Sequence, residues 1–504
     1  MTEIFSGLML GFQTALSVQN LMYCFLGVFL GTFIGVLPGI GALAAVSMLL
    51  PITFYLSPES GVIMLAGVYY GAEYGGSTAS ILLNLPGTPS SAVTALDGHP
   101  MALNGQAGVA LFVTTIASFV GGSIGIVMLM AFAPILAGWA LSFGSSDYFA
   151  IMILGLVAAA VTNRGAPIKG VAMVSLGVML GCVGTDIVTG AGRFTFGNFN
   201  LSDGIDLVAL AMGLFGISEV IASIQSRPQL HTRSIRLRDM LPNRKDAKRI
   251  IMPILRGTGV GAILGPLPGT GPTLASFMSY AVEKKTSKTP ERFGHGAVEG
   301  VAGPEASNNA AAQTAFIPTL TMGIPGTPTM ALIIGALMIH GITPGPLMIS
   351  SQPSVFWGLI ASFWIGNLLL LVLNIPLIGI WVRLLAVPYS LLYPVILVLI
   401  CLGVYSVNNS VFDVYVAIFF GIVGYGMRLL DFEPAPLLIG FVIGPMMEEN
   451  LRRALSMSGG SYQTLIDRPI SATVLAVTAA MLAWMIWRSV TETRNRRATR
   501  LATE

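Results

Sequence analysis

The sequence predicts an all-α polytopic membrane protein, with about 10–12 transmembrane helices plus broken or re-entrant helices, arranged as two inverted repeats. Three observations lead to this fold class. Hydrophobic residues make up 54% of the 504 residues and charged residues only 10%, against roughly 25% charged residues in soluble proteins. Apolar stretches recur along the whole chain. Pro-Gly motifs in the first half also recur in the second half.

The apolar stretches set the expected helices, because a bilayer core of about 30 Å needs roughly 20 apolar residues per helix. We expect spans near residues 20–37, 108–134, 147–162, 168–188, 205–225, 354–380, 388–406, 411–428, 436–450 and 470–487. The longest tracts that are not apolar, about residues 226–249 and 283–309, are too short to fold as a soluble domain. Any soluble recognition or energising domain is therefore expected to be a separate chain.

The charge distribution is uneven. The net charge of +3 is too small to indicate a nucleic-acid partner. Residues 1–163 contain no Lys or Arg, whereas residues 227–292 carry 13 of the 26. Because cytoplasmic loops are enriched in Lys and Arg, the basic linker 227–256 is predicted to be cytoplasmic, and so is the tail 488–500 with its five Arg residues.

An internal duplication is visible in the order of the motifs. Residues 35–41 recur as 265–271, at an offset of 230. Residues 71–73 match 303–305, and residues 85–89 match 324–328, so the offset grows to 239. This growth predicts that the second copy carries about nine inserted residues, mostly between Glu305 and Pro325.

The duplication and the charges together predict the domain organisation. We expect repeat 1 over residues 1–226, the linker over 227–256, repeat 2 over 257–460, and a final transmembrane helix with a basic tail over 461–504. If the final helix lies outside the duplication, repeat 2 is inverted relative to repeat 1 and the N-terminus is outside. This topology places Arg452 and Arg453 on the outer side, against the usual charge bias.

The duplicated Pro-Gly clusters are expected to break membrane helices, because proline lacks an N–H and glycine relaxes the backbone. The N–H groups of the following half-helix then form a positive end that suits a carboxylate. The alternative is a plain turn at the membrane surface. The predicted substrate-binding residues are Pro38, Gly39, Gly41, Asn84, Pro86, Gly87, Thr88, Pro268, Gly269, Gly271, Asn308, Asn309, Pro325, Gly326 and Thr327.

Two acidic residues, Glu73 and Glu305, fall between the paired breaks. A carboxylate at membrane depth normally faces a cavity, a partner or an ion. We therefore predict a sodium site from the two glutamates with the short oxygen-bearing residues Ser77, Thr78 and Ser307. The alternatives are a packing anchor, an interfacial loop, or polar contacts that hold helices together.

Asp97 and His99 follow the first Pro-Gly-Thr-Pro segment, and His340 follows the second. Such residues could relay protons, but Gly98 and Pro100 favour a polar loop. The sequence contains neither a His-Glu-x-x-His motif nor a phosphate-cradling Gly-rich loop, so we expect neither an enzyme nor a resident cofactor.

These motifs resemble a known family. Residues 35–41, 70–77 and 84–100, with second copies at 265–271 and 323–328, resemble the large permease subunit of the tripartite tricarboxylate transporters over essentially the full chain. The resemblance implies a multi-pass protein of the bacterial inner membrane. It also implies two partners, a small four-helix membrane subunit and a periplasmic solute-binding protein.

The resemblance further implies a secondary transporter that imports citrate or related carboxylates by alternating access, driven by a cation gradient, often sodium. Since residues 1–163, which hold the first set of motifs, contain no Lys or Arg, we expect a bound cation and half-helix N-termini to neutralise the carboxylate. Proton coupling and, less favoured, a passive anion channel are the alternatives.

Overall fold

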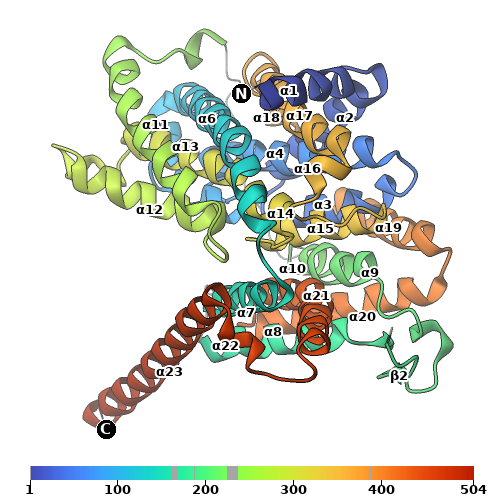
Figure 1. Ribbon diagram of the computed structural model, residues 1–504. Coiled ribbons are helices and arrows are strands. Elements are labelled where there is room, and N and C mark those ends of the chain that lie inside the picture. Colours follow the sequence, from blue (N-terminus) through green and yellow to red (C-terminus); the bar gives the residue numbers. More distant parts are fainter. Residues whose placement is uncertain (1, 162–166, 187, 224–236, 386–388, 504) are drawn as a thin grey trace. The chain divides into compact units, whose positions relative to one another are not determined.

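The computed structural model describes residues 2–161, 167–186, 188–223, 237–385 and 389–503, and these are mostly helical (Figure 1). The predicted all-α fold is confirmed. In the described part, the strands β1 (Gly184–Thr185) and β2 (Gly192–Arg193) form a small antiparallel ladder that pairs Gly184 with Arg193. Arg164 and linker residues 227–236 lie outside the described residues.

The chain divides into two compact units. Unit 1 contains residues 1–138 and 207–425, and unit 2 contains residues 139–206 and 426–504. Each unit therefore combines a part of the predicted first repeat with a part of the predicted second repeat. The elements of unit 2, besides the strands, are α7 (Ser145–Val161), α8 (Pro167–Gly181), η3 (Phe199–Leu201), α21 (Ala435–Met457), α22 (Thr464–Asp467) and α23 (Pro469–Thr503).

Unit 1 contains all the duplicated Pro-Gly motifs. Its elements before residue 207, of which the last extends past the boundary, are α1 (Thr2–Ala15), α2 (Val18–Val36), α3 (Gly41–Thr53), α4 (Pro58–Leu83), η1 (Pro89–Ser91), α5 (Ala92–Met101), η2 (Ala102–Gln106) and α6 (Ala107–Ala140). The later ones, of which the last also extends past the boundary, are α9 (Leu207–Ala211), η4 (Met212–Ile217), α10 (Ser218–Ser223), η5 (Leu237–Met240), α11 (Arg244–Leu264), α12 (Gly271–Thr286), η6 (Pro290–Arg292), α13 (Glu299–Thr314), α14 (Phe316–Met322), α15 (Pro328–Ile339), α16 (Met348–Ser351), α17 (Pro353–Asn374), α18 (Ile378–Leu384), α19 (Tyr389–Asn408) and α20 (Val411–Leu429).

Several helices have the composition of membrane spans. Within the described residues, four helical stretches are long and apolar enough to cross a bilayer: Val18–Val36, Pro89–Ala140, Pro353–Asn374 and Val411–Leu429. Large apolar side chains on α19 and α20, such as Leu399 and Phe419, are exposed. Lipid is the environment in which such side chains are stable on the outside of a protein.

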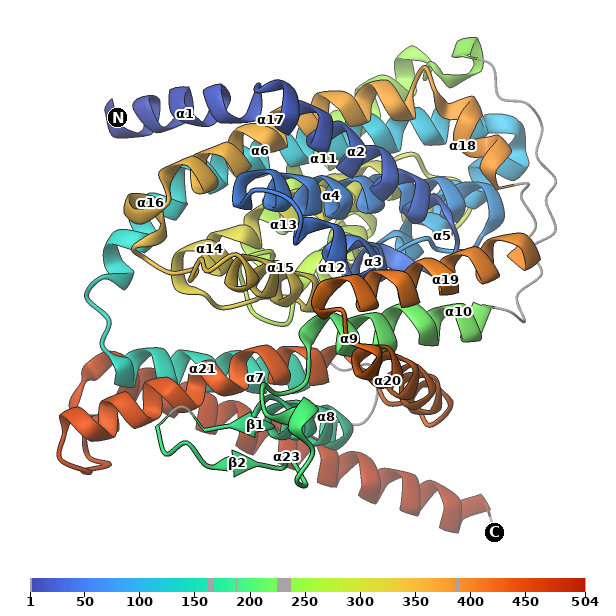
Figure 2. The same cartoon turned by 90° about the vertical axis from the view of Figure 1, so that its right-hand side faces the viewer.

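In the first copy, close contact between α2 and α4 depends on glycine (Figure 2). A Cβ atom added at Gly31 of α2 would lie 2.2 Å from the Val68 carbonyl oxygen of α4. Gly27 and Gly35, one turn to either side, are equally close to the backbone of α4. Small residues that allow two helix backbones to approach are typical of membrane helix interfaces.

In the second copy, α11 and α13 make the same contact. A Cβ atom at Gly261 would lie 2.1 Å from the Ser307 carbonyl oxygen, and Gly257 and Gly265 meet the carbonyls of Gly303 and Ala311. In each copy, therefore, a helix that presents glycines, α2 or α11, packs closely against a buried helix, α4 or α13.

These contacts correct one part of the sequence comparison. The glycines of α2 contact the carbonyls of residues 64, 68 and 72 in α4. The glycines of α11 contact the carbonyls of residues 303, 307 and 311 in α13, so α4 and α13 align at an offset of 239. The inserted residues therefore lie before α13, in the connection from α12, and the prediction that they follow Glu305 is wrong. By this register Glu73 corresponds to Ala312, not to Glu305, because helix packing fixes the alignment more strictly than a short Gly-x-Glu match.

Unit 2 pairs the charges of the loop between α8 and α9 with those of α21. Arg452 donates to Asp186 at 2.8 Å and lies 2.6 Å from Glu448, while Arg193 donates to Glu448 at 2.8 Å. Arg453 pairs with Glu449. The two arginines that the inverted topology would place outside are thus both paired with carboxylates.

We expect Gly261→Ala to destabilise the protein by about 1–3 kcal/mol, because the new methyl group would overlap the α13 backbone. Gly259→Ala in the same helix is the matched control, since nothing lies within 4 Å of its Cβ position. Thermal unfolding of the purified protein would measure both. Equal effects of the two substitutions would contradict the packing role.

Asp186 gives a pH-dependent prediction. The Thr189 N–H, the Arg452 guanidinium and the Val188 N–H hold the pKa of Asp186 well below its usual range. Its ionised form therefore stabilises the loop above the ordinary aspartate pKa of about 3.9, and this contribution is lost only as the pH falls through the lowered pKa. Proteolysis of the loop should be slow from pH 8 to pH 5 in the wild type and faster over that range in Asp186→Asn. Identical cleavage rates would refute the anchor.

Candidate functional site

The four Pro-Gly clusters break helices, as predicted. Helix α2 ends at Val36 before α3, and α4 ends at Leu83 before η1. In the second copy, α11 ends at Leu264 before α12, and α14 ends at Met322 before α15. The sequence prediction of half-helices is therefore confirmed in both copies.

Equivalent backbone positions adopt the left-handed conformation in the two copies. The φ angles of Gly39 and Gly269 are 87° and 81°, and those of Gly41 and Gly271 are 74° and 55°. At the end of the preceding helix, Asn84 has φ 56° where the second copy has Gly323 with φ 67°. Glycine is the residue that adopts this conformation without strain, which explains its place in the motifs.

The two breaks of each copy touch one another. The Gly39 N–H donates to the Pro86 carbonyl at 3.2 Å, and the Gly269 N–H donates to the Gly326 carbonyl at 2.8 Å. Gly87 has no room for a side chain, because a Cβ atom there would lie 2.1 Å from the Gly35 carbonyl oxygen. The Pro-Gly residues that were predicted to bind substrate thus form one paired turn in each copy.

The half-helices differ in how their N-termini are capped. Thr327 accepts a hydrogen bond from the Met330 N–H, and the Ser91 hydroxyl accepts from the Thr88 N–H. The N-cap residues of α3 and α12, Ile40 and Thr270, make no side-chain capping hydrogen bond. The N–H groups at these two helix ends are therefore suited to donate to an anion.

Exposure differs between the copies. Gly39 and Asn84 are exposed and Pro38 and Pro86 half-buried, whereas Pro325 and Gly326 are buried. Pro268 and Gly269 are half-buried. The paired turn of the first copy is thus the more open of the two.

Glu73 is buried among hydroxyl and amide groups. Its carboxylate is reached by the Ser90 hydroxyl at 2.6 Å, and Ser90 also lies 2.9 Å from the Thr88 hydroxyl. The side chain of Asn308, from α13, lies beside the same carboxylate. Of the predicted substrate residues, Thr88 therefore reaches the predicted cation residue Glu73 through Ser90, and Asn308 lies beside it.

Glu305 has a second, similar environment. The Thr94 hydroxyl donates to one carboxylate oxygen at 2.5 Å, and the Ser118 hydroxyl donates to the other at 3.2 Å. Asn309 donates to the Ser118 oxygen at 2.7 Å. Glu305 is 1% exposed, and its carboxylate is close enough to that of Glu73 for the two to interact electrostatically.

Polar atoms without partners lie next to these carboxylates. Within the described residues, the side-chain oxygen and nitrogen of Asn308 and the side-chain oxygen of Asn309 have no hydrogen-bond partner. No Lys or Arg of the described chain forms an ion pair with either glutamate, and no three His, Cys, Asp or Glu side chains converge on a metal position there. Oxygen atoms without donors are suitable ligands for a hard cation such as Na⁺.

The other three predicted cation residues are also buried. The Ser77 hydroxyl donates to the Tyr74 carbonyl of its own helix, and the Ser307 hydroxyl donates to the Ala275 carbonyl of α12. Thr78 is buried in α4. The structure therefore brings Glu73 and Glu305 together with Ser90, Thr94 and Ser118 instead of with the predicted serines.

The sequence reasoning missed these three hydroxyl residues and Asn367. Asn367 of α17 accepts hydrogen bonds from Tyr70 at 2.8 Å and Tyr74 at 2.6 Å, which fixes α4 beside α17. The sequence does contain a pattern that indicates Ser90 and Thr94. They follow a helix break and are four residues apart, which places both on one helix face. Ser118 and Asn367 lie within apolar runs and carried no such signal.

The prediction of a polar loop at Asp97 and His99 is wrong. Both residues lie in α5, where Asp97 is fully buried and His99 contacts the Ile81 carbonyl at 3.0 Å. The helix persists through Gly98 and Pro100 because Asp97 and His99 find partners outside it.

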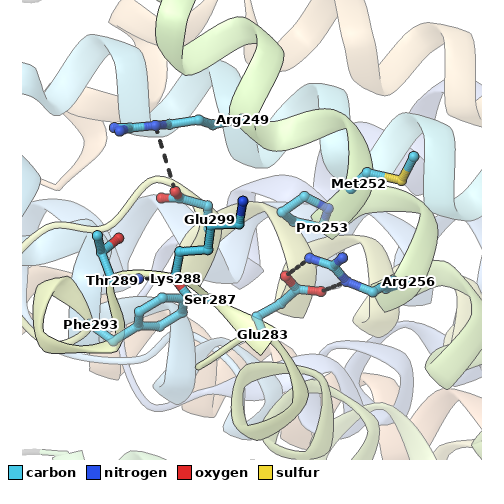
Figure 3. Close-up of a pocket in the computed structure, with 10 residues that line it drawn as sticks. All are labelled: Arg249, Met252, Pro253, Arg256, Glu283, Ser287, Lys288, Thr289, Phe293 and Glu299. Carbon is cyan, nitrogen blue, oxygen red and sulfur yellow. Dashed lines mark hydrogen bonds and ion pairs between the residues drawn. The ribbon is translucent and has the colours of Figure 1, made fainter. Parts of the chain in front are cut away.

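A separate pocket of about 300 Å³ lies among α11, the end of α12 and the start of α13 (Figure 3). Arg256 pairs with Glu283 at 2.8 and 2.6 Å, and Glu299 lies 3.1 Å from Arg292 and 3.9 Å from Arg249. None of the predicted site residues lines it. Its charges are largely paired with one another, so we do not assign the substrate to it.

The chain is similar to two proteins of Agrobacterium vitis. The chain is 51% identical over 496 residues to a protein of Agrobacterium vitis named "Uncharacterized 52.8 kDa protein in TAR-I ttuC' 3'region", which covers 98% of this chain and 99% of that protein. It is 58% identical over 217 residues to a second A. vitis protein, the "Uncharacterized protein in TAR-II ttuC' 3'region". This alignment covers 43% of this chain and 90% of that protein. No solved structure matches the chain.

The model of the tripartite tricarboxylate transporter TctA family matches residues 21–439. This range contains both sets of Pro-Gly breaks, the two buried glutamates and the hydroxyl residues that contact them. The chain therefore belongs to the tripartite tricarboxylate transporter TctA family.

Proposed function

We propose that the chain is the large membrane subunit of a binding-protein-dependent secondary transporter that imports tricarboxylates or related organic acids by alternating access. Its partners are a small four-helix membrane subunit and a periplasmic solute-binding protein, and its location is the bacterial inner membrane. Membership of the TctA family supports this assignment. We also retain the domain organisation, with inverted repeats at 1–226 and 257–460, a cytoplasmic linker at 227–256, and the final helix and tail at 461–504.

The observation that supports a coupling ion is the pair of buried glutamates. Glu73 and Glu305 are 5% and 1% exposed, and their partners are hydroxyl and amide groups. An ionised carboxylate within a membrane protein needs a counter-charge. A co-transported cation supplies that charge in our proposal, and the unpartnered oxygens of Asn308 and Asn309 favour Na⁺ over H⁺ because a metal ion uses several oxygen ligands at once.

The carboxylate substrate is assigned to the paired turns of the two copies. The uncapped N-termini of α3 and α12 begin at Gly41 and Gly271, directly after these turns. Their N–H groups and helix dipoles attract negative charge without Lys or Arg. Thr88 and Asn308 lie beside Glu73, so a cation there would also face a carboxylate bound at the first-copy turn.

We expect Glu305→Gln to weaken Na⁺ binding by at least about 10-fold and Thr94→Val by about 10-fold, since losing a ligand or its hydrogen-bonded neighbour has effects of this size at metal sites. The measurement is the rise in melting temperature of the purified protein in NaCl relative to KCl, because a ligand that binds only the folded state stabilises it. Thr115→Val is the matched control, since that buried hydroxyl bonds only to Leu111 of its own helix.

Uptake of radiolabelled citrate by the complete three-part complex in vesicles tests the transport function. A sodium gradient should drive accumulation in the wild type but not in Glu305→Gln. Accumulation driven by a proton gradient alone would replace the sodium assignment with proton coupling. Flux that needs neither a gradient nor the binding protein would indicate a passive anion channel.

A further inference from the structure

Asp97 is the most heavily hydrogen-bonded carboxylate near the site, although it touches neither glutamate. Its Oδ1 atom accepts from the N–H groups of Gly294 at 2.8 Å, Gly296 at 2.9 Å and Ala297 at 2.8 Å. Its Oδ2 atom accepts from the Tyr280 hydroxyl at 2.9 Å. All four donors come from the second copy, and Asp97 is 0% exposed.

The loop that receives Asp97 is shaped around it. Gly294 and Gly296 have φ angles of 90° and 100°, which aim successive N–H groups at one oxygen. A Cβ atom on Gly300 would lie 2.2 Å from Asp97 Oδ2, so only glycine fits there. This loop belongs to the residues inserted between α12 and α13, and the register places Ala336 where a second Asp97 would stand. The contact therefore exists on one side of the duplication only.

Asp97 shares a helix face with the two hydroxyl residues of the site. Ser90, Thr94 and Asp97 are spaced by four and three residues, which places them on one side of the η1–α5 segment. Ser90 reaches Glu73, Thr94 reaches Glu305, and Asp97 reaches the loop that leads directly into α13. These contacts hold the η1–α5 segment against α4 through Ser90, against α13 through Thr94, and against the loop before α13 through Asp97.

We propose that Asp97 is a positioning residue for the cation site. By binding the loop before α13, it sets the distance between the η1–α5 segment and α13, and so keeps the Thr94 hydroxyl on Glu305. The inference rests on the proposed function only where it speaks of the cation; the positioning of the segment stands on the contacts themselves.

Amide hydrogen exchange in the full-length protein tests the positioning without reference to transport. In Asp97→Ala we expect faster exchange both in the receiving loop, residues 294–297, and in the remote residues 90–94. Tyr280→Phe is the matched control, because it removes only the Oδ2 contact, and should leave residues 90–94 protected. Deprotection confined to residues 294–297 would overturn the proposal, since it would reduce Asp97 to a loop anchor.

Sodium-dependent thermal stabilisation tests the consequence for the site. We expect Asp97→Ala to raise the half-saturating Na⁺ concentration about 10-fold, Asp97→Asn to raise it less, because the amide oxygen still accepts from the loop, and Tyr280→Phe to change it less than about 3-fold. Unchanged Na⁺ dependence in Asp97→Ala would overturn the link to the cation site. If Na⁺ fails to stabilise even the wild type, the proposed sodium site fails, and the exchange experiment alone decides the positioning.

Two further variants keep the test decisive if Asp97→Ala does not fold. Gly300→Ala pushes a methyl group onto Asp97 Oδ2 while leaving the aspartate in place, and should reproduce the exchange pattern of Asp97→Ala. Formate added to Asp97→Gly should restore protection of residues 294–297, because the small carboxylate can accept from the same N–H groups, but not of residues 90–94, because formate is not joined to the η1–α5 segment. Full rescue of residues 90–94 by formate would count against the proposal.

Discussion

Two carboxylates buried without a basic partner are the constraint on which the rest of this structure depends. Glu73 and Glu305 are almost inaccessible, and the described part of the chain provides neither with a Lys or Arg. Burying a charge is costly unless other groups stabilise it. The surrounding hydroxyls and amides, the close helix crossings that seal the region, and the broken helices nearby all serve to hold charge where the sequence supplies no cation.

The backbone framework is duplicated, whereas the polar side chains of the candidate site are not. Glycine-faced crossings and paired turns are repeated in both copies with matching backbone angles. The glutamates are not repeated: the register pairs Glu73 with Ala312 and Glu305 with Ala66. Nor is the loop that binds Asp97. A symmetric scaffold has thus acquired an asymmetric set of polar groups, and these groups meet on α4, α13 and the η1–α5 segment.

The sequence was sufficient to predict the helical membrane fold, the four helix breaks and the two glutamates, because each has a local signal in composition or in Pro-Gly chemistry. It could not predict which hydroxyls reach the carboxylates. Ser77 is near Glu73 in sequence, yet the helical geometry directs its hydroxyl to Tyr74 of its own helix, while Ser90 reaches the carboxylate from the next segment. The same limit explains the error over the insertion, which was visible only from the backbone contacts of α11 with α13.

In the proposed carboxylate symporter, separate groups would bind the two charges. The N-termini of α3 and α12 would attract the anion through weak, fixed dipoles, whereas the glutamates would attract the cation through full charges. A Lys or Arg beside Glu73 or Glu305 would neutralise the acid permanently and leave nothing for an ion gradient to act on. Under this proposal, the absence of Lys and Arg from the first 163 residues is a requirement of coupling, because the charge that completes the site would arrive with the ion and leave with it.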